Sequence, residues 1–328
     1  MANAFVTLIS ALILAGALAG PAAAPVAAAS AESTYYDVAK GSHPHDVAAA
    51  PGASGPVYYT AQTTGRLGIL DPKSATYEEI SLGANSAPHG VIVGPDGAPW
   101  LTDGGLNAMV RVDPATHVVK VFPLPKEFPA ANLNTAVFDK RGVLWFTGQS
   151  GMYGRVNPMI GKVDAWSAPK GYGAYGITVT PSGQLWYCSL ASDYIAQVDL
   201  VSGASTVIEP PRRGVGPRRI WSDSKGMLWS SFWNSGGIGK YDPANKSWTV
   251  YPMPNSTAGT YSVYVDDKDR VWATDWPANS IQRFDPKTEK FESFPSDKAQ
   301  ARVRQMLGRP GEAWGGESGT DRLVVVRD

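Results

Sequence analysis

The sequence predicts an all-β protein, a seven-bladed β-propeller with four-stranded blades. A tryptophan recurs at intervals of 41 to 45 residues, and an aspartate or asparagine recurs in phase with it. The tryptophan series is Trp100, Trp145, Trp186, Trp229, Trp272 and Trp314, preceded one interval upstream by Tyr58. The second series is Asp71, Asp113, Asn157, Asp199, Asp242, Asp285 and Asp328. Two markers in phase over seven repeats are typical of a propeller in which each repeat is one blade.

The internal pattern of each repeat predicts the four strands of a blade. Short runs of alternating apolar residues recur, for example Val143–Phe146 and Ile281–Phe284. Turn signals separate these runs, among them Pro-Asp-Gly at 95–97 and Asp-Pro-Lys at 285–287. A β-sandwich is the alternative, but a sandwich has no reason to repeat both markers seven times.

The ends of the sequence predict how the ring closes. Blades two and six have outermost strands at Val118–Pro123 and Lys290–Pro295, whereas the seventh repeat ends at Asp328 without one. Thr34–Ala39 is a strand-like run that belongs to no blade. We expect this run to complete blade seven by pairing with Leu323–Arg327, because that pairing removes two exposed sheet edges.

The first 31 residues are predicted to be a signal peptide, and residues 32–328 a single propeller domain. Residues 1–31 contain no charged side chain, and their apolar run, Ala4–Leu18, is short for a membrane span. Ala29-Ser30-Ala31 offers a cleavage site, and no cysteine follows the run as a lipid attachment point. We therefore expect an exported protein, periplasmic or secreted, without a stable membrane anchor.

Composition excludes several classes of partner. The 29 basic and 29 acidic side chains balance, and no basic run predicts binding to nucleic acid or to an anionic membrane. Cys188 is the single cysteine, so an intrachain disulfide is impossible, and we expect it to be a buried apolar residue. We expect a monomer whose partner is a small molecule.

Residue types kept in every blade predict the scaffold, and positions that vary predict the site. The tryptophans are expected to fill the space between sheets, and the aspartates to begin turns. One varying position lies eleven residues before each tryptophan, with two extra residues in blade one: His45, His89, Asn134, Tyr175, Arg218, Tyr261 and either Val303 or Arg304. The other lies three residues after it: Ala61, Asp103, Gly148, Ser189, Phe232, Asp275 and Glu317. We expect both series to ring one mouth of the central channel.

The blade motifs resemble those of the virginiamycin B lyase (streptogramin B lyase) family. The motifs in question are Pro-His-Gly-Val at 88–91, Gly-Pro-Asp-Gly at 94–97, Trp-Leu-Thr-Asp at 100–103 and Asn-Ala-Met-Val-Arg-Val at 107–112. The resemblance extends over residues 35–328. It implies the propeller fold and a lyase that opens a cyclic depsipeptide at its ester by β-elimination, with magnesium. It also implies a site built from histidines of Pro-His elements in two neighbouring blades, together with two glutamates.

Carried onto this sequence, the resemblance assigns His89 as the base and His45 as the assisting acid. Asp103 matches one carboxylate, and together with Glu317 it is expected to hold Mg²⁺. The sequence departs from the family in two respects: Ala87 stands where the first glutamate belongs, and the histidines lie in the first two blades rather than in late ones. Residues expected to bind substrate are Tyr175, Arg218, Tyr261, Asp275 and Asn134.

Two other function classes fit the same residues. A non-catalytic binding propeller would use an aromatic rim of Trp233, Trp276, Tyr175 and Tyr261, with Arg218 and Arg219 for an anionic or carbonyl-bearing ligand. A gluconolactonase-like hydrolase would gather Asn134, Asp103, Asp275 and Glu317 around calcium. His43 and His45 also form a His-Pro-His pair suited to a transition metal. The sequence leaves these classes open and does not name a substrate.

Overall fold

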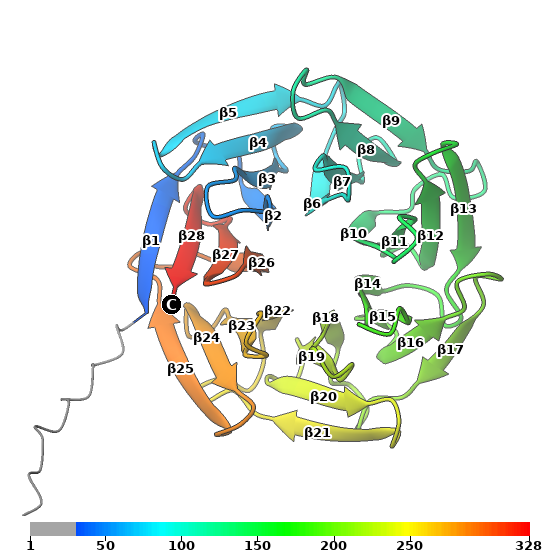
Figure 1. The fold of residues 1–328 in the computed structure, drawn as a ribbon. Coiled ribbons are helices and arrows are strands. Elements are labelled where there is room, and N and C mark those ends of the chain that lie inside the picture. Colours follow the sequence, from blue (N-terminus) through cyan, green and yellow to red (C-terminus); the bar gives the residue numbers. More distant parts are fainter. Residues whose placement is uncertain (1–30) are drawn as a thin grey trace, which may run out of the picture. The chain divides into compact units, whose positions relative to one another are not determined.

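The computed structural model describes residues 31–328, which form seven four-stranded antiparallel sheets arranged in a ring (Figure 1). The space between the innermost strands, into which side chains project, is called the channel below. The predicted seven-bladed propeller is confirmed. Within residues 31–328 the elements are strands β1 to β28, without helices. The predicted signal peptide lies outside the described residues, apart from Ala31.

In every blade the strands run in order from the channel to the rim. The strands of blades one to three are β2 (Pro44–Ala49), β3 (Val57–Ala61), β4 (Arg66–Asp71), β5 (Thr76–Ser81), β6 (Pro88–Val93), β7 (Pro99–Asp103), β8 (Ala108–Val112), β9 (Val119–Pro123), β10 (Leu133–Phe138), β11 (Leu144–Gly148), β12 (Met152–Asn157) and β13 (Lys162–Ser167). Blades four and five contain β14 (Ala174–Val179), β15 (Leu185–Ser189), β16 (Tyr194–Val198), β17 (Ser205–Ile208), β18 (Pro217–Ser222), β19 (Leu228–Phe232), β20 (Ile238–Asp242) and β21 (Ser247–Tyr251). Blades six and seven contain β22 (Thr260–Val265), β23 (Val271–Asp275), β24 (Ser280–Asp285), β25 (Lys290–Pro295), β26 (Val303–Arg309), β27 (Glu312–Glu317) and β28 (Arg322–Arg327), and the N-terminal β1 (Glu32–Asp37) completes the last sheet.

The ring is closed by the N-terminal strand, as predicted. β1 pairs antiparallel with β28 from Glu32 opposite Arg327 to Asp37 opposite Arg322. The strand begins two residues earlier than expected and ends at Asp37. Tyr36 anchors it, because its ring stacks on Trp314 with a centroid distance of 5.5 Å. The first and last strands of the propeller therefore share one sheet, and β1 covers the edge that β28 would otherwise expose.

The tryptophans fill the interfaces between blades. Each of the six is almost fully buried, and each packs against residues of the next blade. Trp100, for example, shares its core cluster with Leu144 and Phe146 of blade three, and Trp314 shares its cluster with Val57 and Tyr59 of blade one. Burying a large aromatic plate at every interface removes much apolar surface from water, which holds neighbouring sheets together.

The aspartates of the second series, apart from the terminal Asp328, begin turns. Asp113 accepts hydrogen bonds from the backbone N–H groups of Ala115 and Thr116 at 3.1 and 2.9 Å. Asp71 and Asp285 accept the same kind of bond from Lys73 and Lys287. These bonds hold the pKa of Asp113 below its ordinary value. The prediction that this series serves the fold is therefore confirmed.

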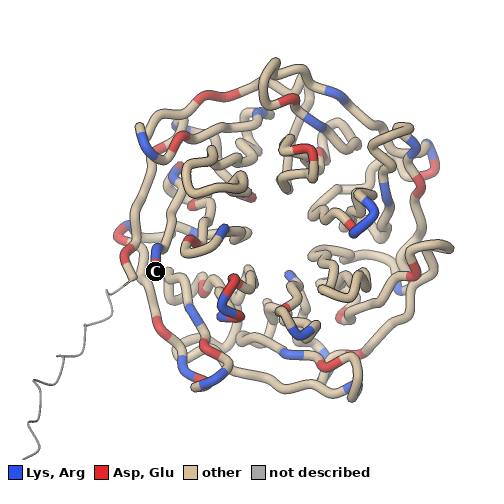
Figure 2. Tube along the Cα trace, viewed as in Figure 1, with Lys and Arg blue, Asp and Glu red and all other residues tan. Residues whose placement is uncertain are grey.

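Positions of acidic and basic residues are interspersed along the backbone of the ring, in keeping with the formal net charge of zero (Figure 2). Within residues 31–328 no helix is long and apolar enough to cross a membrane. Cys188 is buried, and burial raises the pKa of its thiol to about 12, which suits an unreactive apolar residue.

Candidate functional site

The innermost strand of every blade carries a β-bulge at the same place. The register of β2 on β3 shifts between Pro44 and Val47, and equivalent shifts occur in the other six blades. A bulge re-aims the side chains that it contains. The residues at this point, called the channel ring below, are His45, His89, Asn134, Tyr175, Arg218, Tyr261 and Arg304. In blade seven the bulge contains Arg304, while Val303 pairs with Glu317, and this settles the choice that the sequence left open.

Hydroxyl groups on the second strands fix this ring from the neighbouring blade. Thr60 of blade one donates to the carbonyl of His89 at 2.8 Å, and Thr102 of blade two donates to the carbonyl of Asn134 at 2.5 Å. Ser231 donates to the carbonyl of Tyr261 at 2.9 Å. Each of these bonds ties the backbone of a ring residue to the adjacent sheet, so the ring side chains project from rigid backbone.

The structure brings His45 and His89 into contact at the channel. Their ring centroids lie 3.8 Å apart at an angle of 48°. With Asp46 they form the one group of three potential metal-ligating residues found in residues 31–328, with ligand atoms within 4.8 Å of one another. All three side chains are buried. The two predicted histidines therefore converge, and they do so with a carboxylate that was not assigned to the site from the sequence.

The hydrogen bonds of His45 define its protonation. Its Nδ1 lies 2.8 Å from Oδ1 of Asp46, and a carboxylate accepts, so Nδ1 carries the proton. Its Nε2 faces two donors, NH1 of Arg304 at 3.0 Å and the hydroxyl of Tyr261 at 3.3 Å. Nε2 therefore presents a lone pair toward the channel, and Asp46 orients the ring, as an orienting group does for a catalytic base.

A chain of hydrogen bonds fixes His89 in the same tautomer, with its Nε2 rather than its Nδ1 engaged. Arg219 can only donate, and its NH1 bonds to Oγ1 of Thr135, whose proton then goes to Oδ1 of Asn134 at 2.8 Å. This turns the amide of Asn134 so that Nδ2 donates to Nε2 of His89 at 3.2 Å. The proton of neutral His89 therefore sits on Nδ1, which is buried without a hydrogen-bond partner within residues 31–328.

Burial and neighbouring cations keep both imidazoles neutral. Burial lowers the pKa of His45 well below its usual value, and Arg304, Arg219 and Arg218 lower it further. Burial lowers the pKa of His89 well below its usual value too, with His45 as the next cause. Burial raises the pKa of Asp46, although Arg219 opposes the shift. Neutral imidazoles at pH 7 are the form that acid–base chemistry requires here.

Arginines and tyrosines make the rest of the ring cationic and aromatic. Arg219 pairs with Asp46 at 3.0 Å and is fully buried. Arg218 lies over the ring of Tyr261 at 3.9 Å and donates to the hydroxyl of Tyr175 at 2.7 Å. Burial alone would raise the pKa of Tyr261, but Arg218, Arg219 and Arg304 outweigh burial and lower it to about 8.

The second varying series does not line the channel, contrary to our expectation. Asp103, Asp275 and Glu317 are buried at the ends of second strands, each bonded to a serine of the loop from the preceding blade: Ser86 at 2.5 Å, Ser256 at 2.6 Å and Ser296 at 2.7 Å. Asp103 also accepts from the backbone N–H groups of Ala87 and Leu106, both at 2.9 Å. These carboxylates fasten loops between blades.

Asp103 and Glu317 are therefore not placed as ligands of a common cation. Both oxygens of Asp103 are engaged by its own loops, and Glu317 pairs with Arg322 at 2.6 Å. The calcium set suggested for a hydrolase does not assemble either, because Asp103, Asp275 and Glu317 each bond within a different loop. Asn134 alone of that set reaches the channel ring.

The residues of the channel ring do not fit a magnesium ion. Mg²⁺ prefers oxygen ligands in near-octahedral geometry. The ring offers two imidazoles and the carboxylate of Asp46, which is already paired with Arg219. Arg304 lies on Nε2 of His45, so a guanidinium group stands where a cation would have to bind. The same positive charges oppose a transition metal on His45, Asp46 and His89, and His43 is likewise bonded to Arg304, at 3.3 Å.

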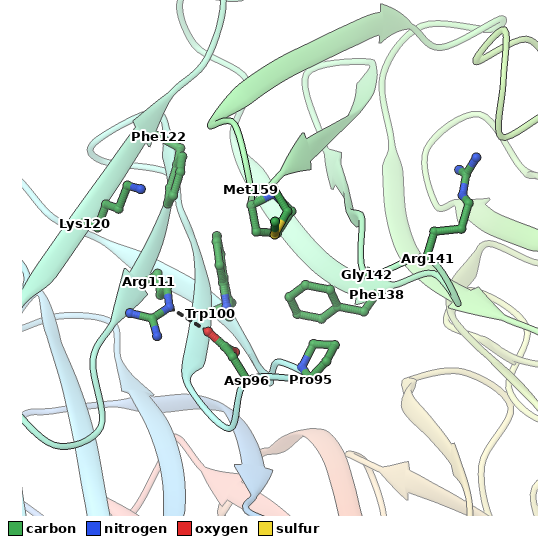
Figure 3. A pocket seen from close by; sticks show the side chains of 11 residues that line it. Pro95, Asp96, Trp100, Arg111, Lys120, Phe122, Phe138, Arg141, Gly142 and Met159 are labelled. Atoms are coloured by element: carbon green, nitrogen blue, oxygen red, sulfur yellow. Dashed lines mark hydrogen bonds and ion pairs between the residues drawn. The ribbon is translucent and has the colours of Figure 1, made fainter.

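Two cavities open beside the channel ring. One, of about 450 Å³, is lined by His89 together with Ala87, Gly104 and Asn132. The other, of about 670 Å³, is walled by Trp233 and Trp276. A third cavity, of about 410 Å³, lies between blades two and three and contains no ring residue (Figure 3). There Arg111 is paired with Asp96 at 2.8 Å and Trp100 belongs to the blade interface, so this cavity is a by-product of the scaffold.

Asp46, Thr135 and Arg219 were missed as partners of the histidines. They occupy the position that directly follows the channel ring, whose members are Asp46, Gly90, Thr135, Gly176, Arg219, Ser262 and Gln305. This position also varies in chemistry from blade to blade, and that signal was available. Pairing of blade one with blade five across the channel leaves no trace in sequence spacing.

The sequence profile of the virginiamycin B lyase family matches residues 75–328. The chain belongs to the virginiamycin B lyase family. No curated protein sequence matches it. Two solved structures of the virginiamycin B lyase from Staphylococcus aureus superpose with a TM-score of 0.83 at 19% identity, covering 91% of this chain and 100% of theirs. One of them is a catalytically inactive His-to-Ala variant with quinupristin.

Two further solved structures, a streptogramin B lyase and a hydrazine synthase, share the fold. A streptogramin B lyase structure gives a TM-score of 0.81 at 19% identity over 90% of this chain and 97% of its own. Hydrazine synthase from Kuenenia stuttgartiensis gives 0.73 at 11% identity over 88% of this chain and 97% of that chain. Likeness at these identities shows the fold alone, so the function must be argued from the channel ring.

Proposed function

We propose that this protein is a carbon–oxygen lyase that opens a cyclic ester by β-elimination at the channel ring. The observation that carries the proposal is the Asp46–His45 pair, in which the carboxylate orients a neutral imidazole whose Nε2 lone pair faces the channel beside His89. Membership of the virginiamycin B lyase family supports the reaction class. The inactive His-to-Ala variant of a relative supports a histidine-dependent reaction.

In this proposal His45 is the base and His89 the hydrogen-bond donor, the reverse of the assignment made from the sequence. Nε2 of His45 takes the proton from the carbon next to the one that bears the ester oxygen, where an adjoining carbonyl group of the substrate acidifies it. The electron pair released forms a C=C bond, and the bond from the adjacent carbon to the ester oxygen breaks. The carboxylate leaves with that bond's electrons and accepts a hydrogen bond from Nδ1–H of His89. Asp46 stabilises the imidazolium that forms on His45.

Arginines would supply the stabilisation of negative charge that a metal supplies elsewhere. As the proton leaves, charge develops on the carbonyl oxygen of the substrate. Arg218 and Arg304 flank Tyr261 at the channel and place two guanidinium groups near that oxygen. Charge stabilisation by fixed donors in a site shielded from water contributes strongly to catalysis. The proposal therefore uses no step through Mg²⁺, which the donor set does not fit.

A turnover assay on cyclic depsipeptides and simple lactones tests the proposal. Elimination gives a product of unchanged mass with a new C=C bond, whereas hydrolysis adds one water. We expect elimination, undiminished by EDTA, and a loss of about 10²–10⁴-fold in His45→Ala. Asp113→Asn, on an exposed turn, is the control and should keep full turnover. Hydrolysis, or full activity in His45→Ala, would contradict the mechanism.

A non-catalytic binding propeller is the second candidate. The observation in its favour is that Nε2 of His45 is covered by the guanidinium of Arg304, which must leave before a substrate proton can approach. Ligand binding at the channel without turnover of any ester would leave this candidate standing.

The proposal places the protein outside the cytoplasm, as a monomer acting on a small molecule. Cleavage after Ala31 would leave the closing strand β1 whole, because β1 begins at Glu32. N-terminal sequencing of protein recovered from the periplasm or the medium tests this. A chain still beginning at Met1 would show that the leader is not removed.

A further inference from the structure

We propose that the channel binds a ligand carrying a carboxylate, held between Arg218 and Arg304, with its apolar part against Trp233 and Trp276. This inference names the substrate class of the proposed lyase and rests on that function only in placing substrate at the same ring. It follows from the charges, the unused hydrogen-bond donors and the walls of the neighbouring cavity.

The charge balance at the ring is positive. Three arginines reach the histidine and tyrosine cluster, and among the described residues Asp46 is the one carboxylate hydrogen-bonded to it. Asp46 forms an ion pair with Arg219, the most buried of the three arginines, so its negative charge is balanced by that residue. Within residues 31–328, Arg218 and Arg304 form no ion pair with any carboxylate. Two guanidinium groups on one channel wall therefore lack a counter-charge, which an anionic ligand would supply.

The unused polar groups at the ring are donors. Nε of Arg218 is buried without a hydrogen-bond partner within the described chain, and so is Nδ1 of His89. The bonds of Asn134 place a proton on that nitrogen of His89, whose side chain is only 7% exposed. Buried donors without acceptors are costly, so the ring is complementary to an acceptor-rich group. A carboxylate provides two acceptor oxygens and matches the fork of an arginine.

The neighbouring cavity supplies aromatic walls. Trp233 and Trp276 meet edge to face with centroids 5.3 Å apart, and both line the cavity of about 670 Å³. The guanidinium of Arg218 lies 4.5 Å from the ring centre of Trp233, and that of Arg304 lies 5.3 Å from that of Trp276. The cations therefore stand at the boundary between the aromatic cavity and the ring. A ligand with an apolar or aromatic body and a carboxylate at one end fits this order of surfaces.

The ligand's carboxylate also explains how His45 would become accessible. Arg304 covers Nε2 of His45 through a bond between a cation and a neutral nitrogen. A bond between the same guanidinium and a carboxylate is stronger, because both partners are charged. Binding of the anion would draw Arg304 from Nε2 and leave the lone pair free for the substrate proton.

Binding of phenylacetate, compared with its uncharged analogue phenylacetamide, tests the inference by calorimetry and tryptophan fluorescence. We expect phenylacetate to bind more tightly than the amide. Arg218→Gln/Arg304→Gln should weaken phenylacetate binding by about 10- to 100-fold. Arg218→Lys and Arg304→Lys should recover part of the affinity, because they keep the charge and lose the fork. Arg111→Gln, in the cavity of Figure 3, is the matched control and should bind as the parent does.

The outcomes separate this inference from the lyase proposal. Equal affinity for acid and amide, no binding of phenylacetate, or unchanged affinity in the correctly folded double arginine variant would overturn the inference. Carboxylate binding that depends on the arginines, without turnover of any ester, would sustain the inference and refute the lyase. Turnover of neutral cyclic esters with no preference for carboxylates would sustain the lyase proposal and overturn the inference.

Discussion

Asp46 and Asp103 are both buried carboxylates at the same end of neighbouring blades, yet they belong to different kinds of structure. Asp103 is bonded to Ser86, Ala87 and Leu106, which lie within 17 residues of it in the chain. Asp46 bonds to His45 beside it and to Arg219 in blade five, across the channel. A carboxylate satisfied by its own loops stabilises those loops. A carboxylate satisfied by side chains from across the ring organises a site whose groups come from several blades.

The closing strand offers the largest test of the scaffold. Removing residues 32–37 should lower the free energy of unfolding by several kcal/mol, because the deletion exposes the edge of β28 and uncovers Trp314. Thermal melting and light scattering of the shortened mature chain measure the loss. A shortened chain that melts and stays soluble like the parent would show that β1 does not close the ring.

Asp46→Asn tests the channel carboxylate against the loop carboxylate. It should destabilise the fold by about 3–5 kcal/mol, because Arg219 is left buried without a counter-charge. Asp103→Asn should cost about 1–3 kcal/mol through weakened loop bonds. Urea denaturation measures both, and turnover should vanish in the first variant and survive in the second. Equal effects of the two variants on stability and turnover would show that Asp46 and Asp103 do not differ in role.

The pH dependence of stability tests whether the histidines are neutral. The pKa of both His45 and His89 lies well below 6.5 when the protein is folded. Below about pH 6.5 the unfolded chain therefore binds protons that the folded protein does not. The stabilising contribution of the two neutral histidines is fully present above that pH. As the pH is lowered further, the free energy of unfolding decreases by about 1.4 kcal/mol per pH unit for each histidine, until the pKa of that histidine in the folded protein is reached.

Denaturation series from neutral pH to about pH 5 measure this slope. Asp46 acts in the opposite sense, because burial raises its pKa and a raised carboxyl pKa makes stability increase as the pH falls, so it does not produce the loss. His89→Gln should make the slope shallower by about one histidine's share. An identical slope in parent and variant would mean that folding does not lower the pKa of His89.

Asp113→Asn should have the smallest effect. Asp113 caps an exposed turn with two backbone hydrogen bonds, so its replacement should cost no more than about 1 kcal/mol and leave turnover unchanged. Urea denaturation and the ester assay check both. A loss of turnover in this variant would show that the repeated aspartates reach beyond the scaffold.

Periodicity in the sequence was enough to predict the scaffold and six of the seven channel-ring positions. The tryptophans and turn aspartates repeat because every interface poses the same packing problem. His45 and His89 were located because equivalent positions in a propeller must form a ring. Arg304 was ambiguous because its spacing to Trp314 is one residue shorter than the corresponding spacing in blades two to six.

The features of the site that the sequence did not predict depend on the direction of side chains and on the width of the channel. The residue type at the position of Asp103 varies between blades as strongly as it does at the position of His89. A bulge directs the side chain of His89 into the channel, whereas the side chain of Asp103 bonds to its own loop. No spacing reveals which of two neighbouring varying positions a bulge will re-aim. The Asp46–Arg219 pair depends on the distance across the ring, and that distance is set by packing between blades rather than by any local motif.

The mass of the product formed from a cyclic ester, in the presence of EDTA, tests the central claim most directly. We predict a product of the same mass as the substrate, carrying a new C=C bond, formed by the parent and reduced by about 10²–10⁴-fold in His45→Ala. A product heavier by one water, or turnover that EDTA abolishes and Mg²⁺ restores, would contradict a metal-free elimination at the Asp46–His45 pair.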